Sequence, residues 1–314
     1  MNLIRDSSLK VILPSKRANI YYLEYCRIVQ KNGRVLYLNE GKNGNLYWNI
    51  PIANTNVILL GNGTSITQAS MRILAKAGVL IGFCGGGATP LFSGCEIEWL
   101  SPQSEYRPTE YVQNWMKFWF DENKRLLAAK NLQISRIEFI KTIWNKDKDF
   151  KEKELYFKNI DLEYILDNYK NKIINSDRIS DLLSYEATLT KKLYQINSKI
   201  CNIKDFSRQH ESTDLANNFL NHGNYLAYGL AATTLWVLGI PHGFAVMHGK
   251  TRRGALVFDV ADLIKDAIVL PLSFICAEKN FQEQEFRQTL LQKFTEHKVL
   301  DFMFNKVKNI ALKN

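Results

Sequence analysis

The spacing of hydrophobic residues changes character near residue 100. Before that point, β-branched and aromatic residues come in short runs bounded by Gly, Asn or Pro, which is typical of strands. One helix is expected over Ser65–Ala77, with Thr64 or Ser65 as its N-cap and Gly78 at its end. Short strands with frequent turns usually form a sandwich. The predicted strands are 18–25, 34–39, 46–50, 57–60 and 79–83.

The pattern becomes helical after residues 101–108. Residues 109–144 contain neither Gly nor Pro and carry apolar residues near helical spacing. Helical spacing returns over 178–196 and over 257–270, the second ending before Pro271. A chain of 314 residues also exceeds what one core usually fills. We therefore predict an α+β protein with two domains, an N-terminal β-sandwich-like domain over 1–105 and a C-terminal α-helical domain over 106–314.

One carboxylate lies within an apolar helical stripe. At 100° per residue, Glu186 falls between Leu182 and Leu189 at the centre of the stripe. Burying an isolated charge costs several kcal/mol, so this carboxylate needs a cation. That cation is either a metal ion or an Arg or Lys from another helix.

Two further carboxylates share one face of the predicted helix 257–270. Asp259 and Asp262 are three residues apart, and Asp266 follows one turn later. Like charges so placed repel, and a divalent cation would remove that repulsion. The alternative is that Asp259 caps the helix while Asp262 is solvated or pairs with Lys265 or Lys250.

His248 precedes these aspartates by 11 and 14 residues, so a reversal of the chain can bring it back to them. Considered alone, it is more typical of a core or surface histidine whose hydrogen bonds are satisfied without a metal. Together with Glu186, Asp259 and Asp262 it forms a mixed carboxylate and imidazole set that suits Mn²⁺ or Mg²⁺ better than structural zinc. Such a cation can polarise a phosphoryl oxygen, which predicts phosphodiester chemistry.

Composition adds an anionic partner to this prediction. The chain has 41 Lys and Arg against 31 Asp and Glu, a formal charge of +10, which favours nucleic acid. Lys250, Arg252 and Arg253 occupy the turn between His248 and Asp259, where they either neutralise phosphates or form a solvated turn. Five scattered cysteines without a C-x-x-C pair, and the lack of a long apolar run or signal peptide, predict a cytoplasmic protein that does not enter a membrane.

The sequence also resembles a known family. The segment HGKTRRGALVFDVADLIKD resembles the metal-binding segment of the CRISPR-associated spacer-acquisition endonuclease and integrase, the universal adaptation protein of CRISPR systems. Other segments along nearly the whole chain resemble the subtype I-F branch of this family: SKRANIYYLEYCR, YWNIPIANT, GNGTSITQASMR, GFCGGGATPLFS, SPQSEYRPTEYVQ and FLNHGNYLAYGLAAT.

The resemblance implies a site and a reaction. Glu186, His248 and Asp262 would bind Mg²⁺ or Mn²⁺, with Asp259 in or beside the coordination shell. A DNA 3′-hydroxyl would attack a phosphodiester at the repeat boundary of the CRISPR array, and branched DNA would be cut in the reverse sense. The basic turn would contact DNA, and Tyr25 would match an aromatic wedge that splays duplex ends, with Tyr21 and Tyr22 as alternatives.

The resemblance also implies partners. The chain would act as a homodimer on double-stranded prespacer DNA and the CRISPR repeat, using its N-terminal domain for dimerisation and DNA contact. A ferredoxin-like adaptation protein, fused in this branch to the interference helicase-nuclease, would assist it. Two other functions remain open at this point, a DNA-binding scaffold with idle carboxylates and a structure-selective DNA repair nuclease.

Overall fold

The chain divides into two compact units. One comprises Met1–Gly86 with Glu98–Glu105, and the other comprises Gly87–Ile97 with Tyr106–Asn314. The computed structural model describes residues 17, 19–41, 44–86, 98–100, 109–153, 155, 160–209, 214–249 and 254–313.

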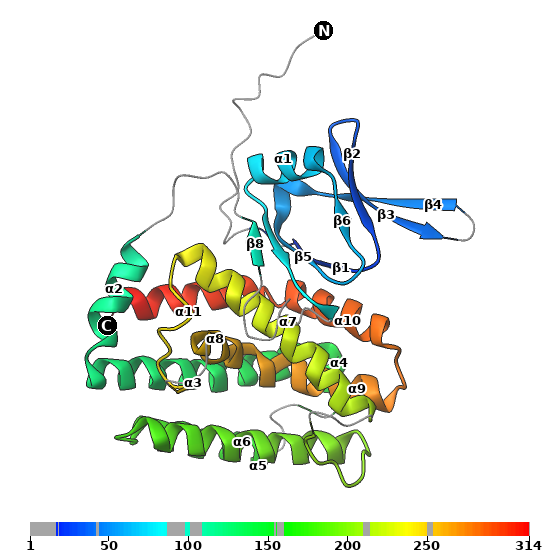
Figure 1. Ribbon diagram of the computed structural model, residues 1–314. Coiled ribbons are helices and arrows are strands. Elements are labelled where there is room, and N and C mark those ends of the chain that lie inside the picture. The colour runs from blue at the N-terminus through cyan, green and yellow to red at the C-terminus, as the bar shows by residue number, and fades with distance from the viewer. Residues whose placement is uncertain are drawn as a thin grey trace. The chain divides into compact units, whose positions relative to one another are not determined.

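The N-terminal unit holds two four-stranded sheets (Figure 1). The first has the order β1-β5-β7-β8, in which β1, β5 and β7 are parallel and β8 is antiparallel to β7. The second has the order β4-β3-β2-β6, in which β2, β3 and β4 form an antiparallel meander. The strands are β1 Asn19–Leu23, β2 Arg27–Lys31, β3 Arg34–Gly41, β4 Gly44–Ile50, β5 Thr55–Leu60, β6 Ser65–Ile66, β7 Leu80–Phe83 and β8 Glu98–Leu100.

The five predicted strands are present, and the predicted helix is shorter than expected. It begins three residues late, as α1 Gln68–Lys76, because Ser65–Ile66 pairs with β2 as strand β6. Thr67 is therefore the N-cap, and its hydroxyl accepts the Ser70 amide at 3.3 Å. Gly78, with φ of +72°, follows the helix as predicted. Strands β2, β6 and β8 were not predicted.

One apolar core serves both sheets and α1. Every residue of β5 is buried, because β5 lies in the middle of its sheet with both faces covered. Its fully enclosed members are Ile28 of β2, Val35 of β3, Ile58 of β5, Leu74 of α1 and Val79, which precedes β7.

The second unit is helical. Its helices are α2 Glu110–Trp119, α3 Glu122–Lys146, α4 Lys148–Glu152, α5 Ile160–Ile174, α6 Ile179–Ile200, α7 Leu215–Leu238, α8 Ala255–Ile264, α9 Leu270–Glu278, α10 Glu283–Glu296 and α11 Val299–Lys313. The run 109–144 is two helices rather than one, because Asp121 accepts the amides of Asn123 and Lys124 and so starts a new helix. Within the described residues, no helix is both long and apolar enough to span a membrane.

Helix α8 is the centre of this unit. It packs against α3 on one side and α7 on the other, while α6 packs against α3 and α9 (Figure 1). Nine of its ten residues are buried, including both Asp259 and Asp262. Two charged side chains in the middle of a helical core need specific partners.

Pro271 does not end the helix that carries these aspartates, contrary to the prediction. Helix α8 passes into a π-helical turn, Lys265–Val269, and the chain continues through Pro271 as α9. In a regular helix the missing N–H of Pro271 would leave the Ala267 carbonyl without a donor. The indole N–H of Trp144 on α3 donates to that carbonyl at 3.0 Å, which satisfies the buried acceptor.

A candidate metal centre in the helical unit

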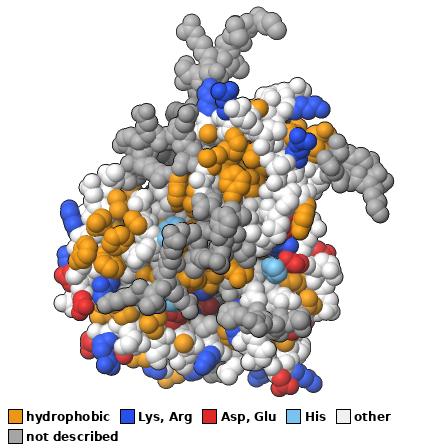
Figure 2. All heavy atoms as spheres, viewed as in Figure 1, with side chains coloured by type: hydrophobic (Ala, Val, Ile, Leu, Met, Phe, Trp, Pro, Cys, Tyr) orange, Lys and Arg blue, Asp and Glu red, His pale blue; other side chains and the backbone are white. Residues whose placement is uncertain are grey.

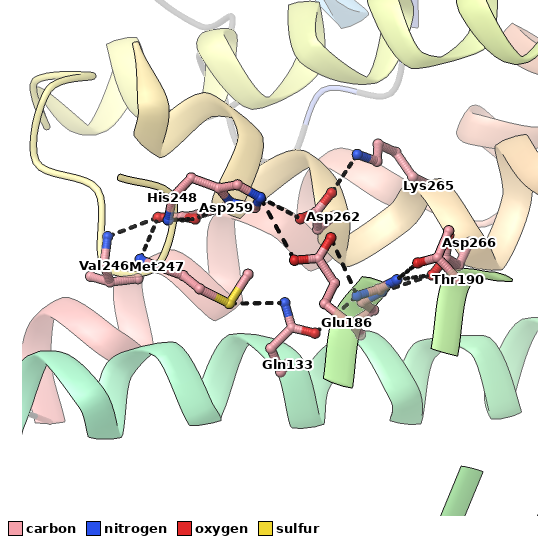
Figure 3. Close-up of polar contacts among 11 residues, drawn as sticks. Gln133, Glu186, Thr190, Val246, Met247, His248, Asp259, Asp262, Lys265 and Asp266 are labelled. Carbon is pink, nitrogen blue, oxygen red and sulfur yellow. Dashed lines mark hydrogen bonds and ion pairs between the residues drawn. The ribbon is translucent and has the colours of Figure 1, made fainter. Parts of the chain in front are cut away.

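Three segments bring Glu186, His248 and Asp262 together. Glu186 comes from α6, Asp262 from α8, and His248 from the loop between α7 and α8 (Figure 3). The His248 Nε2 atom lies 3.7 Å from Glu186 Oε2 and 4.0 Å from Asp262 Oδ2. One donor atom from each residue lies within 4.8 Å of the other two.

These separations fit a shared cation. Ligands at about 2.0–2.3 Å from one ion lie roughly 3 to 4.5 Å from each other. Asp262 Oδ2 is also buried and receives no hydrogen bond from any described residue, although a buried carboxylate oxygen ordinarily has a partner. Two carboxylates and one imidazole would leave coordination positions open, as a catalytic site requires.

Asp259 lies beside this cluster and performs a different task. Its Oδ2 accepts the amides of Val246 at 2.8 Å and Met247 at 3.1 Å. Its Oδ1 accepts the His248 amide at 3.0 Å and lies 2.7 Å from His248 Nδ1. The carboxylate therefore faces the loop and does not cap its own helix. With Nδ1 donating to Asp259, Nε2 is the nitrogen free to bind a metal.

Glu186 also faces a buried arginine that sequence reasoning missed. Arg136 Nη1 on α3 lies 3.8 Å from Glu186 Oε1. The same guanidinium donates to Asp266, to Thr190 Oγ1 at 2.7 Å and to Gln133 Oε1 at 3.0 Å. The sequence feature that could have revealed Arg136 is a basic residue within the apolar part of the helical run predicted over 109–144. The arginine that was the alternative to a metal is thus present. It lies near Oε1 of Glu186, whereas Oε2 is the oxygen near His248.

Lys265 pairs with Asp262, as one of the alternatives anticipated. Its ammonium lies 2.5 Å from Asp262 Oδ1 and 5.4 Å from the centre of the Tyr228 ring. This leaves Oδ2 as the oxygen that points toward His248. A small pocket opens beside Lys265 and Glu186, with Arg136, Thr190, Tyr194, Leu220, Asn224, Asp266 and Leu270 as its other lining residues.

Burial and charge shift the ionisation of the whole set. Burial, together with the negative charge of Asp262, raises the pKa of Glu186 to about 7. Burial also opposes ionisation of Asp262, but Lys265 and Arg136 hold the pKa of Asp262 below its ordinary value. For His248, the bond to Asp259 and the nearby carboxylates outweigh burial and raise the pKa. Protons and a metal ion would therefore compete for Glu186 and His248.

Of the predicted DNA-contact residues, the structure describes Tyr25. Lys250, Arg252 and Arg253 lie outside the described residues. Tyr25 lies in the N-terminal unit between β1 and β2, with φ of +48° and 73% exposure. A positive φ is uncommon for a tyrosine. The Tyr25 ring also lies against Gly63, where a Cβ atom would be only 2.6 Å from the ring. Tyr21 packs against the N-terminal core and Tyr22 donates to Glu24, so Tyr25 is the most exposed of the three.

Comparison with known proteins shows the family. Residues 20–302 match the family described as "CRISPR associated protein Cas1". The chain belongs to the Cas1 family. It is 54% identical over 318 residues to "CRISPR-associated endonuclease Cas1" of Pectobacterium atrosepticum, covering 99% of this chain and 98% of the relative. It is 51% identical over 317 residues to the same-named protein of Pseudomonas aeruginosa, again covering 99% and 98%.

Solved structures of Cas1 family members and a casposase share the fold. "Crystal structure of TtCas1-DNA complex" aligns with a TM-score of 0.66 at 17% identity, covering 93% of this chain and 91% of that one. "Casposase bound to integration product" aligns at 0.66 and 12% identity, covering 94% and 91%. "Partial Cas6-RT-Cas1--Cas2 complex" aligns at 0.60 and 13% identity, covering 94% and 96%. The strand-rich N-terminal domain and helical C-terminal domain are thus those of the Cas1 fold.

Proposed function

We propose that this chain is a divalent-metal-dependent DNA endonuclease and integrase that inserts short foreign DNA into a CRISPR array. The observation that carries the proposal is the cluster of Glu186, His248 and Asp262, whose donor atoms lie within 4.8 Å of one another around an unpartnered carboxylate oxygen. The names of the relatives support the nuclease part, and the casposase structure with an integration product supports the joining part. The sequence phrases quoted above favour the I-F branch.

Each site residue has a distinct role in this proposal. Glu186, His248 and Asp262 would hold Mg²⁺ or Mn²⁺, which when bound polarises the phosphodiester and stabilises its developing charge. Asp259 fixes the imidazole so that Nε2 faces the cluster. Lys265 and Arg136 limit the repulsion between Asp262 and Glu186, because each cation contacts one of the two carboxylates. In the joining reaction the attacking 3′-hydroxyl oxygen would form a bond to phosphorus while the bond from phosphorus to the leaving 3′ oxygen breaks. The attacking hydroxyl loses its proton, and the leaving oxygen gains one.

The DNA path and the partners follow from charge and from the family. We assign Lys250, Arg252 and Arg253 to phosphate contacts and Tyr25 to the splaying of duplex ends. The formal charge of +10 supports an anionic partner. On the face shown in Figure 2, Lys and Arg side chains of the described residues are scattered rather than gathered in one patch.

The proposed working form is a homodimer in the cytoplasm, with the N-terminal domain, residues 1–105, in dimerisation and DNA contact. A ferredoxin-like adaptation partner, fused to the interference helicase-nuclease, would complete the assembly. The Cas1 and Cas2 named together in one solved complex support such a partner. Branched DNA would be a second substrate, cleaved in the reverse sense of joining.

A strand-transfer assay tests the proposal. Wild-type protein, Mn²⁺, a short duplex with 3′-hydroxyl ends and a supercoiled plasmid carrying the cognate repeat should give joined products. Asp262→Ala should lower joining at least about 100-fold while DNA affinity changes little, because the metal serves the transition state more than binding. If Asp262→Ala joined DNA at a rate near that of the wild type, this site would be refuted. If the wild type gave no joined products even with the adaptation partner present, the integrase function would be refuted.

A DNA-binding scaffold is the second candidate, favoured by the cations already paired with Asp262 and Glu186. A scaffold would bind DNA equally with and without EDTA and would bind no Mn²⁺ through Glu186, His248 and Asp262. Calorimetric titration of the wild type and Asp262→Ala with Mn²⁺ separates the two functions. A repair nuclease would use the same site, and preference for repeat-containing targets distinguishes it from an integrase.

A further inference from the structure

We infer that Trp115 and Trp119 of α2 are positioning residues for His248. The inference rests on the proposed metal site, because it concerns the histidine of that site. Both indoles bind the loop 244–248, which ends at His248 and belongs to no helix or strand. Among the described residues, neither tryptophan forms a hydrogen bond or a ring contact with a candidate ligand, so we expect any effect on metal binding to pass through the loop.

The loop is held from two sides. From α2, Trp115 Nε1 donates to the Phe244 carbonyl at 3.0 Å, and Trp119 Nε1 donates to the Ala245 carbonyl at 2.7 Å. From α8, Asp259 accepts the amides of the next three residues, 246–248. Each of the five residues 244–248 thus has one backbone group hydrogen-bonded to a side chain. The carbonyls of 244 and 245 accept from the α2 indoles, and the amides of 246–248 donate to Asp259 of α8.

The spacing on α2 explains why two tryptophans can do this. Residues four apart in a helix lie on one face about one turn apart, so the two indoles point the same way. Trp119 also packs edge-on against Phe244, with ring centroids 5.1 Å apart. The Arg125 guanidinium lies over the Trp119 ring, 5.4 Å from its centre, and donates to the Trp119 carbonyl at 3.3 Å. The indole that holds Ala245 is therefore itself held in place.

The consequence concerns the distance between His248 and the carboxylates. Its ring reaches Glu186 and Asp262 from a loop, whereas both carboxylates project from helices. Without the indole donors, the carbonyls of Phe244 and Ala245 would need new hydrogen-bond partners. The loop would then sample other conformations. The imidazole would then spend less time within 4.0 Å of Asp262. Groups that orient a metal ligand typically contribute 10–100-fold to metal affinity.

The test uses Trp115→Phe with Trp119→Phe, which removes both N–H donors and keeps aromatic rings. The full-length variant should bind Mn²⁺ about 10-fold more weakly than wild type by calorimetry. In the absence of metal, hydrogen exchange of the amides of residues 246–248 should become faster. Trp144→Phe is the matched control, since it loses an indole bond of 3.0 Å to a backbone carbonyl, that of Ala267, and should leave exchange at 246–248 unchanged.

A double-mutant cycle with His248→Ala separates positioning from general loosening of the fold. If the tryptophans act through His248, they should not weaken Mn²⁺ binding further once His248 is Ala. A full 10-fold loss in that background would overturn the inference. So would unchanged Mn²⁺ affinity in the tryptophan variant, or unchanged exchange at 246–248. A wild type that binds no Mn²⁺ would refute the proposed function, while the exchange experiment would still test the hold on the loop.

Discussion

Two aspartates three residues apart on α8 illustrate how surroundings set the role of a side chain. Asp259 meets three backbone amides and an imidazole nitrogen, so both its oxygens are occupied. Asp262 meets Lys265 through one oxygen and leaves the other without a hydrogen bond from the described residues. The first is suited to orienting a ligand and the second to being one.

The ionisation of Glu186 and His248 predicts how metal binding should depend on pH. Because burial and Asp262 raise the pKa of Glu186 to about 7, and the neighbouring carboxylates raise that of His248, both hold protons at lower pH. Mn²⁺ must displace those protons, so its affinity should fall as pH drops below about 7, by up to about tenfold per pH unit for each proton displaced.

Calorimetry in two buffers of different ionisation enthalpy measures the number of protons released. His248→Ala should release fewer protons than wild type at about pH 6. An affinity that stays constant between about pH 5.5 and pH 8 would contradict the shifted ionisation of these two groups.

At the scale of elements, the π-helical turn depends on a contact with α3. Trp144 is completely buried and donates to the Ala267 carbonyl, to which Pro271, four residues later, has no N–H to donate. Trp144→Phe should lower the free energy of unfolding by about 2 kcal/mol, since a buried acceptor loses its partner. Chemical denaturation measures this loss. As a control, Trp48→Phe changes a partly exposed ring on β4 and should lower the free energy of unfolding by less than about half as much. Equal losses of stability in the two variants would show that the bond to the Ala267 carbonyl contributes nothing special.

A buried ion cluster joins the start of α4 to α10. Asp147 Oδ2 lies 2.8 Å from Lys293 Nζ and 2.7 Å from His297 Nε2, and Asp147 Oδ1 caps α4. Burial by itself would raise the pKa of Asp147, but the bonds from His297 and Lys293 lower it to about 2. A carboxyl whose pKa is lower in the folded state than in the unfolded state stabilises the fold above its unfolded pKa.

This cluster predicts the acid response of the helical unit. The stabilisation by Asp147, on the order of 2 kcal/mol, should be complete above about pH 4 and disappear as pH falls through about 2. Asp147→Asn should therefore lower the melting temperature at pH 6 and differ less from wild type at about pH 2.5. A difference that stays constant over this range would show that the charge of Asp147 contributes nothing.

At the scale of the whole molecule, the positive charge should make DNA binding depend strongly on salt. A logarithmic plot of affinity against salt concentration should be linear, with a slope set by the number of phosphates contacted. Arg252→Ala with Arg253→Ala should weaken binding to all sequences and reduce the slope by up to about 2. Fluorescence anisotropy at several salt concentrations measures it, with Lys191→Ala and Lys192→Ala together on α6 as a charge-matched control. An unchanged slope would remove the two arginines from the DNA path.

Local pattern was sufficient for much of this protein. Alternation and turn residues located the five predicted strands, because strand periodicity is a local property. The position of Glu186 in an apolar stripe and of two aspartates on one helix face singled out these carboxylates, since burying a charge is costly whatever the fold. Helix boundaries were less accurate where a polar side chain such as Thr67 or Asp121 stopped or started a helix.

Tertiary structure alone decided which charges meet. The distance between Glu186 and His248 depends on how α6 and the loop after α7 pack, and no spacing along the chain contains it. For the same reason Arg136 was missed, and spacing alone did not separate the role of Asp259 from that of Asp262, because Glu186 and the amides of 246–248 are distant in the chain. Pro271 signalled a helix end locally, yet a distant tryptophan supplied the missing donor and the chain stayed helical. Sequence determined which side chains required partners, and packing determined which partners they received.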